Sequence, residues 1–298
     1  MTNISITPVT KSRITEVDFD NLGFGKIFSD HMFVADYYDG AWHDYRIVPL
    51  EDLLEAMKTL VLMEKEWIPT AVGSSLYLRP FMFATDEYLG VAASTTYRLM
   101  ILACPSGVYY SKPIKLLAED HYVRAVKGGV GEAKTAGNYA ASLYPAKLAR
   151  EKGFDQILWL DGIYNKYVQE VGTMNIFFVL KDKVMTPAED GAILKGVTRN
   201  SLMKILKSRG IEVVEKLISI DEVIDEYNKG NLIEIFGAGT AAVVTNVSSM
   251  TYKDITISFD ESNWELSNNL KNTINQLRNG EIEDTFDFTM RIEEPVAI

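Results

Sequence analysis

Helical and strand patterns alternate through the second half of this sequence, and this order restricts what the chain can fold into. Helices are predicted near residues 138–152, 199–208, 221–229 and 264–278. Gly153 and Gly210 end the first two. Short apolar strands are predicted at residues 156–160, 168–170, 174–180, 211–214 and 232–236. Elements in this order predict an α/β (α+β) fold, in which helices cover a sheet.

The first hundred residues have a different pattern. Acidic residues open a predicted helix at residues 51–67, and strands are predicted at 75–79 and 97–103. A short linker pattern follows at residues 108–113. We therefore predict two domains, which are a small N-terminal α/β domain, residues 1–108, and a larger C-terminal domain, residues 109–298.

Composition excludes several classes of function. The net charge of -11 argues against binding to nucleic acid or to an acidic membrane surface, because both need basic surface. The one cysteine, Cys104, cannot form an intrachain disulfide, and the three histidines lack the spacing of metal ligands. No apolar run could span a bilayer, and no signal pattern opens the chain. The expectation is a cytoplasmic protein with no metal.

Lys134 is the first candidate for chemistry. It lies in residues 128–139, among glycines and small side chains, just ahead of a helical pattern. Glycines let the backbone approach a ligand closely. An amine held beside a bound carbonyl can form a Schiff base, as in pyridoxal-phosphate enzymes. A solvated lysine on a turn would give the same local sequence.

Two nucleotide-binding motifs can be tested near these glycines, and both fail. Gly129 and Gly131 begin a dinucleotide fingerprint, but Lys134 stands where its last small residue belongs. Gly25 and Lys26 lack the upstream glycine of a P-loop.

Downstream segments supply the other groups that a pyridine cofactor needs. A pyridine nitrogen stays protonated beside a buried carboxylate, and Glu170 stands between apolar Val168 and Val171. A phosphate needs N–H donors at a helix start, which residues 196–201 provide around Thr198. Residues 237–241 give a second small-residue turn. Each feature also has a plain structural explanation, as a surface carboxylate, a helix cap or a tight connection.

Together these segments resemble one family. Residues 123–139 (VRAVKGGVGEAKTAGNY) are similar to the Schiff-base segment of branched-chain amino-acid aminotransferases. The family's other motifs follow in order, as EVGTMN at 170–175, GAILKGVTR at 191–199 and FGAGTA at 236–241. Upstream, SLYLRP at 75–80 also matches. The resemblance implies a two-domain, fold-type IV pyridoxal 5′-phosphate enzyme, a homodimer whose active site lies between the domains.

The resemblance also implies roles for individual residues. Lys134 would form the Schiff base, Tyr139 would bind the phenolic oxygen, and Glu170 would hold the pyridinium nitrogen. The phosphate would be bound by Val197, Thr198 and Thr240, while Arg124 would support the site. The residues expected to meet the substrate are Tyr77, Arg79, Thr173, Gly239 and Ala241.

The activity implied is transamination of leucine, isoleucine and valine with 2-oxoglutarate, so the partners are small amino acids and 2-oxo acids. An apolar pocket with Arg79 at its edge could accept both an aliphatic side chain and a carboxylate. Two other activities of the same fold group stay open, namely D-amino-acid transamination and aminodeoxychorismate cleavage. Ala242 and Thr245 replace the thiol pair of some relatives, so no redox switch is expected.

One departure from the family is large. Several tens of residues, with an arginine that pairs with the cofactor phosphate, are missing between Pro49 and Leu50. Losing a charge-assisted phosphate contact would cost about 2 kcal/mol of cofactor binding. The small domain is thus shortened after Pro49. Either a segment is absent from this sequence alone, or the chain is a shortened form, which could be a non-catalytic binding or assembly protein.

Overall fold

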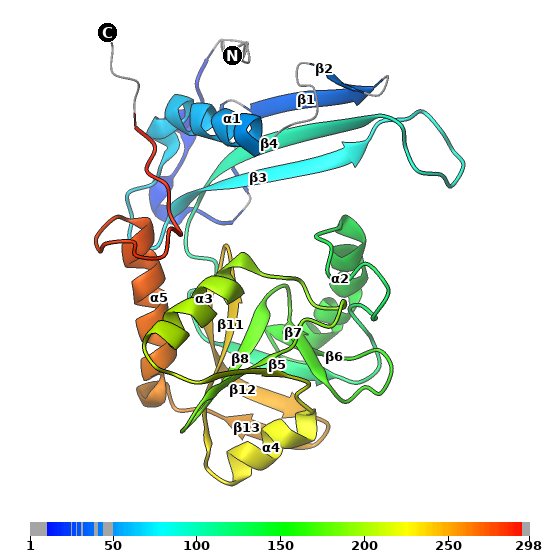
Figure 1. The fold of residues 1–298 in the computed structure, drawn as a ribbon, viewed down its shortest axis with the longest axis vertical. Helices are drawn as coiled ribbons and strands as arrows, with labels where there is room; N and C mark the ends of the chain where they lie inside the picture. Colours follow the sequence, from blue (N-terminus) through cyan, green and yellow to red (C-terminus); the bar gives the residue numbers. More distant parts are fainter. Residues whose placement is uncertain are drawn as a thin grey trace. The chain divides into compact units, whose positions relative to one another are not determined.

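The chain folds into two compact units. The structure, a computed structural model, describes residues 11–24, 26–27, 29–30, 32–38, 41–43 and 50–293 (Figure 1). One unit comprises Met1–Tyr109 with Met290–Ile298, and the other comprises Tyr110–Thr289. The division lies one residue beyond the predicted boundary. The residues from Met290 onward group with the first unit, whereas the sequence predicts them in the larger domain.

The first unit is built on an antiparallel sheet. Its described residues form four strands in the order β2-β1-β4-β3. Their bounds are β1 Met32–Tyr38, β2 Ala41–His43, β3 Ser75–Ala84 and β4 Tyr97–Ser106. Short 3-10 turns, η1 Ile14–Glu16 and η2 Phe19–Asn21, precede them.

One helix covers one face of this sheet. Helix α1 (Leu50–Met63) begins with acidic residues that suit the positive end of its dipole, and η3 (Lys65–Trp67) extends it. Ala56 and Leu60 pack against Ile101 and Ala103 of β4. The helix predicted at residues 51–67 and the burial of Cys104 are thereby confirmed.

The opposite face of this sheet carries exposed apolar side chains. On β4, Leu102 and Arg98 lie on the face opposite to Ile101, which packs against α1. Met32 pairs with Leu102 and Phe83 with Arg98, so both side chains point away from α1. Met32 is 52% exposed and Phe83 42% exposed. The Pro49–Leu50 junction itself lies outside the described residues, which resume at Leu50.

The second unit is a larger mixed sheet. Residues 110–289, all of them described, form nine strands in the order β10-β9-β8-β11-β12-β5-β6-β7, with β13 on β12. The β5–β6, β5–β12 and β9–β10 pairs are parallel. The strand bounds are β5 Ile114–Glu119, β6 Gln156–Leu160, β7 Val168–Val171, β8 Asn175–Leu180, β9 Val184–Pro187, β10 Val213–Lys216, β11 Leu232–Gly239, β12 Val243–Tyr252 and β13 Ile255–Ser258.

Helices cover both faces of this sheet. They are α2 Ala136–Glu151, α3 Val197–Ser208, α4 Ile220–Asn228 and α5 Glu265–Arg278, with η4 Glu261–Asn263 before α5. Phe178 faces the core that α4 closes, whereas its neighbour Phe177 faces the core under α3 and α5. Because successive side chains of a strand point to opposite faces, β8 is buried along its whole length. The predicted mixed α/β fold is confirmed.

The sequence placed most of these elements and misjudged one connection. Strands β5, β9, β12 and β13 were not predicted. Residues 237–241, predicted as a turn, are strand as far as Gly239, where β11 ends, and the loop to β12 spans residues 240–242. Within the part of the chain that the structure describes, no helix combines the length and apolar character needed to cross a membrane.

Candidate active site

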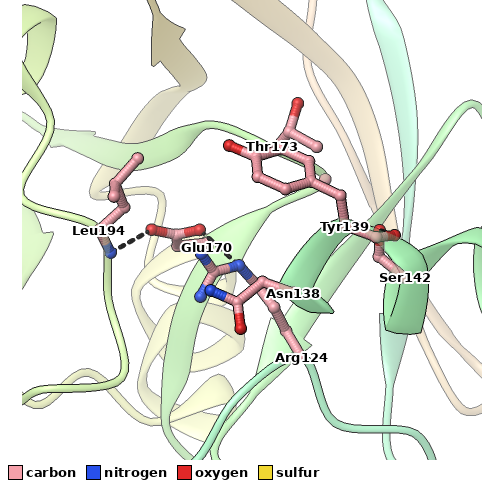
Figure 2. A pocket seen from close by; sticks show the side chains of 8 residues that line it. Arg124, Asn138, Tyr139, Ser142, Glu170, Thr173 and Leu194 are labelled. Atoms are coloured by element: carbon pink, nitrogen blue, oxygen red, sulfur yellow. Dashed lines mark hydrogen bonds and ion pairs between the residues drawn. The ribbon is translucent and has the colours of Figure 1, made fainter. Parts of the chain in front are cut away.

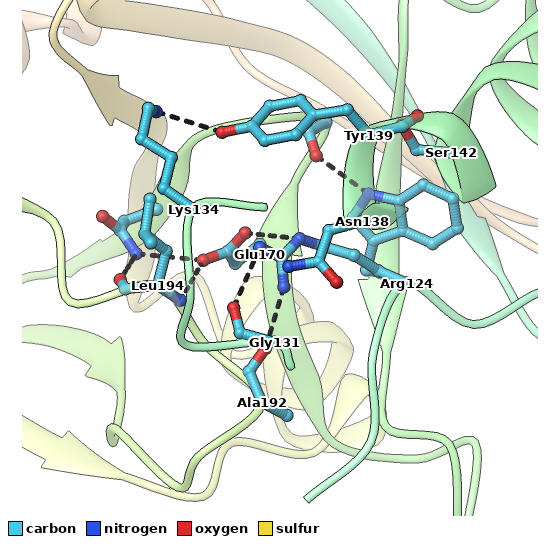
Figure 3. A network of polar contacts seen from close by, with 12 residues as sticks. Arg124, Gly131, Lys134, Asn138, Tyr139, Ser142, Glu170, Ala192 and Leu194 are labelled. Carbon is cyan, nitrogen blue, oxygen red and sulfur yellow. Dashed lines mark hydrogen bonds and ion pairs between the residues drawn. The ribbon is translucent and has the colours of Figure 1, made fainter. Parts of the chain in front are cut away.

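Lys134 lies in the loop that leads into α2, two residues before the helix begins. Its Nζ donates a hydrogen bond of 3.0 Å to the Tyr139 hydroxyl in the first turn of α2 (Figure 3). Buried Asn138 fastens this loop, because its Nδ2 donates to the carbonyls of Val130 at 2.8 Å and Ala133 at 2.9 Å. The exposed amine of Lys134 is thus held on a backbone that the helix start fixes.

Glu170 is a buried carboxylate at the centre of a polar network. It is 2% exposed, and its Oε2 lies 2.8 Å from Arg124 Nε. The Leu194 N–H donates to its Oε1 at 2.7 Å. Burial raises the pKa of Glu170 from its ordinary value of 4.5 to about 7, while Arg124, the Leu194 N–H and Lys134 act in the opposite direction. The sequence prediction of a buried carboxylate at this position is correct.

Arg124 joins three segments around this carboxylate. Its guanidinium donates to the Ala192 carbonyl at 2.8 Å and to the Gly131 carbonyl at 3.4 Å, besides pairing with Glu170. Gly131 must approach closely, since a Cβ there would lie 2.4 Å from the Ala192 oxygen. The loop that carries Lys134 is therefore tied to the same arginine as Glu170.

Most of these side chains line one pocket, shown in Figure 2, but Lys134 is not among its lining residues. Four of the predicted residues take part directly, Arg124, Tyr139 and Glu170 for the cofactor and Thr173 for the substrate. Asn138, Ser142, Gly172 and Leu194 complete the lining. The Tyr139 hydroxyl and the buried Glu170 carboxylate thus come together from two segments that are distant in sequence, and the Lys134 amine reaches them through its hydrogen bond to Tyr139.

The start of α3 supplies a candidate anion site. Val197 and Thr198 are its first residues, and Gly196 precedes them as the N-cap without any side-chain cap. Free N–H groups at a helix start favour a phosphate or carboxylate. Gly196 is constrained to glycine here, because a Cβ would lie 2.0 Å from Asn175 Oδ1. Leu194 lies two residues before Gly196, and its N–H donates to Glu170. The buried carboxylate and the start of α3 therefore lie in one region of the unit.

The loop between β11 and β12 carries three more predicted residues. Thr240 and Ala241 lie in it and Gly239 ends β11, where the adjacent Ala238 pairs with Asn175 at the start of β8. The loop therefore leaves the sheet beside the start of β8, which Thr173 precedes by two residues. These three residues do not line the pocket described above, so their contacts remain predictions.

Tyr77 and Arg79 belong to the first unit. They lie two residues apart on β3, and the Arg79 guanidinium stands 5.1 Å from the centre of the Tyr77 ring. The pocket lies in the other unit, so a role of this pair beside the pocket stays a prediction.

The sequence patterns missed three groups of the network. Asn138 and Asn175 stand inside motifs that were recognised, yet no role was predicted for either amide. Leu194 acts through its backbone, which no side-chain pattern reveals. Their position inside recognised motifs is the one sequence signal that could have drawn attention to the two asparagines, because a buried amide needs hydrogen-bond partners.

Comparison with known proteins agrees with this geometry. Residues 48–250 match the family model for amino-transferase class IV. The chain is 40% identical to branched-chain-amino-acid aminotransferase 2 of Bacillus subtilis, covering 95% of this chain and 96% of that protein.

Solved structures show the same fold. That of the Escherichia coli branched-chain amino acid aminotransferase gives a TM-score of 0.69 at 24% identity, covering 88% of this chain and 90% of that one. An aminotransferase from Brucella abortus, bound to the cofactor pyridoxal phosphate, gives 0.59 at 20% identity, covering 82% of this chain and 88% of that one.

The alignment with the Bacillus subtilis relative also bears on the shortened domain. Its 347 aligned positions exceed the 298 residues of this chain by 49, so at least that many positions are gaps in this chain. The relative is therefore longer than this chain within the aligned region, while a gap located after Pro49 stays a prediction.

Proposed function

Because this chain belongs to the class IV aminotransferase family, we propose that its pocket carries out transamination with pyridoxal 5′-phosphate as cofactor. The enzyme is a branched-chain-amino-acid transaminase, which converts leucine, isoleucine or valine to the 2-oxo acid and 2-oxoglutarate to glutamate. The observation that carries this function is the identity of 40% to the Bacillus subtilis enzyme over nearly the whole of both chains. The polar pocket supplies matching chemistry.

The residues of the pocket fit this cofactor. Glu170 is a buried carboxylate with an oxygen beside Arg124, the setting that a protonated pyridine nitrogen requires. Lys134 offers an amine on an exposed loop for the covalent link, and Tyr139 offers a hydroxyl within hydrogen-bond distance of it. When bound, the cofactor supplies an electron sink conjugated to the substrate Cα.

Each polar residue then has a separate task. Lys134 Nζ removes the proton from the substrate Cα, and its bond to the Tyr139 hydroxyl orients the amine. Arg124 holds the Glu170 carboxylate in place and favours its ionised form, whose charge would hold the proton on the pyridine nitrogen. Val197 and Thr198 offer N–H groups to the phosphate at the α3 N-terminus, and Thr240, in the loop after β11, is assigned to the same group.

Substrate recognition is assigned to the remaining predicted residues. Thr173 lines the pocket, while Gly239 and Ala241 lie at the end of β11 and in the loop after it. Tyr77 and Arg79 would bring an aromatic ring and a cation from the first unit, which would then act as the small domain and the second unit as the large one. An arginine that pairs only with a substrate carboxylate lets one pocket take leucine and glutamate in turn.

A substrate panel tests the activity. L-leucine, L-isoleucine and L-valine should each yield a 2-oxo acid with 2-oxoglutarate as acceptor, by ping-pong kinetics. Turnover of D-alanine alone would assign the chain to another activity of the fold group. Release of pyruvate from aminodeoxychorismate without an amino acceptor would do the same.

The assembly proposed is a homodimer. Several apolar side chains of the second unit are exposed around Gly162, whose neighbours include Val123 and Val126. Val126 is 42% exposed, Ile163 68% and Tyr164 71%, and such a contiguous patch is typical of an interface. The expected cytoplasmic location stays a prediction that cell fractionation would test.

A shortened, non-catalytic form is the second candidate. It is favoured by the gap of at least 49 aligned positions and by the exposed apolar face of the first unit's sheet. Such a form would bind the cofactor weakly or not at all. The intact network of Lys134, Glu170 and Arg124 favours the enzyme.

A further inference from the structure

The backbone of Leu194, a residue that lines the pocket, lies between two buried side chains. The Leu194 N–H donates to Glu170 Oε1 at 2.7 Å, as Figure 3 shows, and the Leu194 carbonyl accepts from Asn175 Nδ2 at 2.9 Å. The same Nδ2 lies 3.4 Å from Glu170 Oε1. Glu170 is 2% exposed and Asn175 6% exposed. The Glu170 carboxylate, the Asn175 amide and the Leu194 backbone thus form a closed ring of hydrogen bonds.

The other end of the Asn175 amide meets the start of α3. A Cβ on residue 196 would lie 2.0 Å from Asn175 Oδ1, so the amide oxygen packs directly on Gly196. Gly196 is the N-cap of α3, and Val197 and Thr198 follow it. One side chain therefore touches both the carboxylate group and the helix N-terminus.

We propose that Asn175 is a positioning residue that couples the two ends of the cofactor site. It holds the N-terminus of α3 in register with the Glu170 carboxylate. The phosphate end and the pyridine-nitrogen end then become ordered together. This inference rests on the roles proposed above for Glu170, Val197 and Thr198.

The physical reason is the cost of leaving buried polar groups unpaired. If the α3 N-terminus shifts, the Leu194 backbone moves with it and Asn175 and Glu170 both lose partners. An anion that pins Gly196 and the first turn of α3 therefore also fixes Glu170. A second ligand that needs Glu170 then finds it already ordered and binds more tightly.

The two halves of the cofactor can be tested separately. Pyridoxal lacks the phosphate, and inorganic phosphate lacks the ring, so their mutual effect on binding reports the coupling. Affinity of the full-length apoprotein for pyridoxal is measured from the absorbance of the Lys134 adduct, with and without saturating inorganic phosphate. The reverse titration checks the result, because the coupling must be equal in both directions.

In the unaltered protein, phosphate should tighten pyridoxal binding by about 5- to 10-fold. In Asn175→Ala this ratio should fall to about 1, although each ligand alone still binds. Thr186→Val is the matched control, since Thr186 is fully buried and its hydroxyl donates to the adjacent Ile176 carbonyl at 2.7 Å. It removes a comparable buried bond without touching Glu170 or α3, so the ratio should stay as in the unaltered protein.

Gly196→Ala provides a second test if Asn175→Ala fails to fold. Its new methyl group would collide with Asn175 Oδ1 and displace the amide, so this variant should also abolish the coupling. A ratio that stays unchanged in the folded variants overturns the proposal, as does an unaltered protein in which phosphate has no effect. If the unaltered protein forms no pyridoxal adduct on Lys134, the site assignment itself fails, and the coupling with it.

Discussion

At Glu170, burial and ion pairing act in opposite directions on one carboxyl group. Burial raises the pKa of Glu170 to about 7, although Arg124 lies only 2.8 Å away. The sequence predicted this buried carboxylate from its apolar neighbours. It predicted Arg124 only as support for the site, because the pairing joins a loop and a strand that are far apart in the chain.

The stability of the apoprotein should depend on this carboxyl group. Its pKa is raised on folding, so the native state holds the proton more tightly, and the free energy of unfolding should fall as pH rises from about 4.5 to about 7. The change should reach up to about 3 kcal/mol. Glu170→Gln should remove this slope, whatever its effect on overall stability, in denaturant titrations at several pH values.

Exposed Glu151 provides the control for that experiment. Glu151→Gln should retain the pH dependence of the unaltered protein, since this side chain lies at the surface of α2. If Glu170→Gln shows the same slope as the unaltered protein, the carboxyl group does not titrate as described.

Lys134→Ala should abolish transamination without unfolding the chain. The side chain is exposed and its Nζ donates to the Tyr139 hydroxyl, so the free energy of unfolding should change by less than about 1 kcal/mol. Lys127→Ala changes another exposed lysine of the same loop and should leave turnover intact. Normal turnover by Lys134→Ala would disprove the assignment of this residue.

Among the elements, the strands of the second unit show best what a local pattern can and cannot reveal. Strand β6 was predicted with its observed bounds, because a compact apolar run forms it. Gly237 and Gly239 were predicted in a turn, but Gly237 belongs to a strand that Met174 crowds, with its Cε 2.8 Å from the position of a Cβ. Glycine is required at this position because Met174, which is distant in the chain, lies so close. A local sequence pattern cannot predict such a contact.

The loop before α2 offers a matched pair of glycine variants. Gly131→Ala should displace the Lys134 loop, because its Cβ would lie 2.4 Å from the rigid Ala192 carbonyl oxygen. We expect a loss of about 2 kcal/mol of stability or more, together with weaker cofactor binding. Gly137→Ala, in the first turn of α2 with open space around it, should stabilise the protein by about 0.5 kcal/mol.

Thermal unfolding and cofactor titration measure both effects. Equal cofactor affinity in the two variants would show that the close approach of Gly131 to Ala192 does not hold the Lys134 loop.

Over the whole molecule, a two-part organisation could be predicted from the sequence, but not the surfaces that each part leaves exposed. The apolar patch with Ile163 and Tyr164 arises where residues 123–126 pack beside Gly162, a contact that no local motif encodes. The exposed face of the first unit's sheet is a second such surface, since Met32 and Phe83 are 52% and 42% exposed and no local motif predicted it.

The dimer proposal makes a prediction at this scale. Ile163→Arg should convert a dimer to monomers in sedimentation equilibrium, because it puts a charge into the apolar patch. Ile255→Arg, at a residue 48% exposed on β13, should leave the assembly unchanged. A dimer that tolerates Ile163→Arg would place the interface elsewhere.

The central claim is that this shortened chain still holds its cofactor on Lys134. Borohydride reduction of the purified protein, followed by peptide mapping and a visible spectrum before and after, tests it most directly. We predict a yellow protein that loses its colour on reduction and carries the pyridoxyl group on Lys134. A colourless protein that pyridoxal phosphate does not reconstitute, or an adduct on a different lysine, would contradict the account.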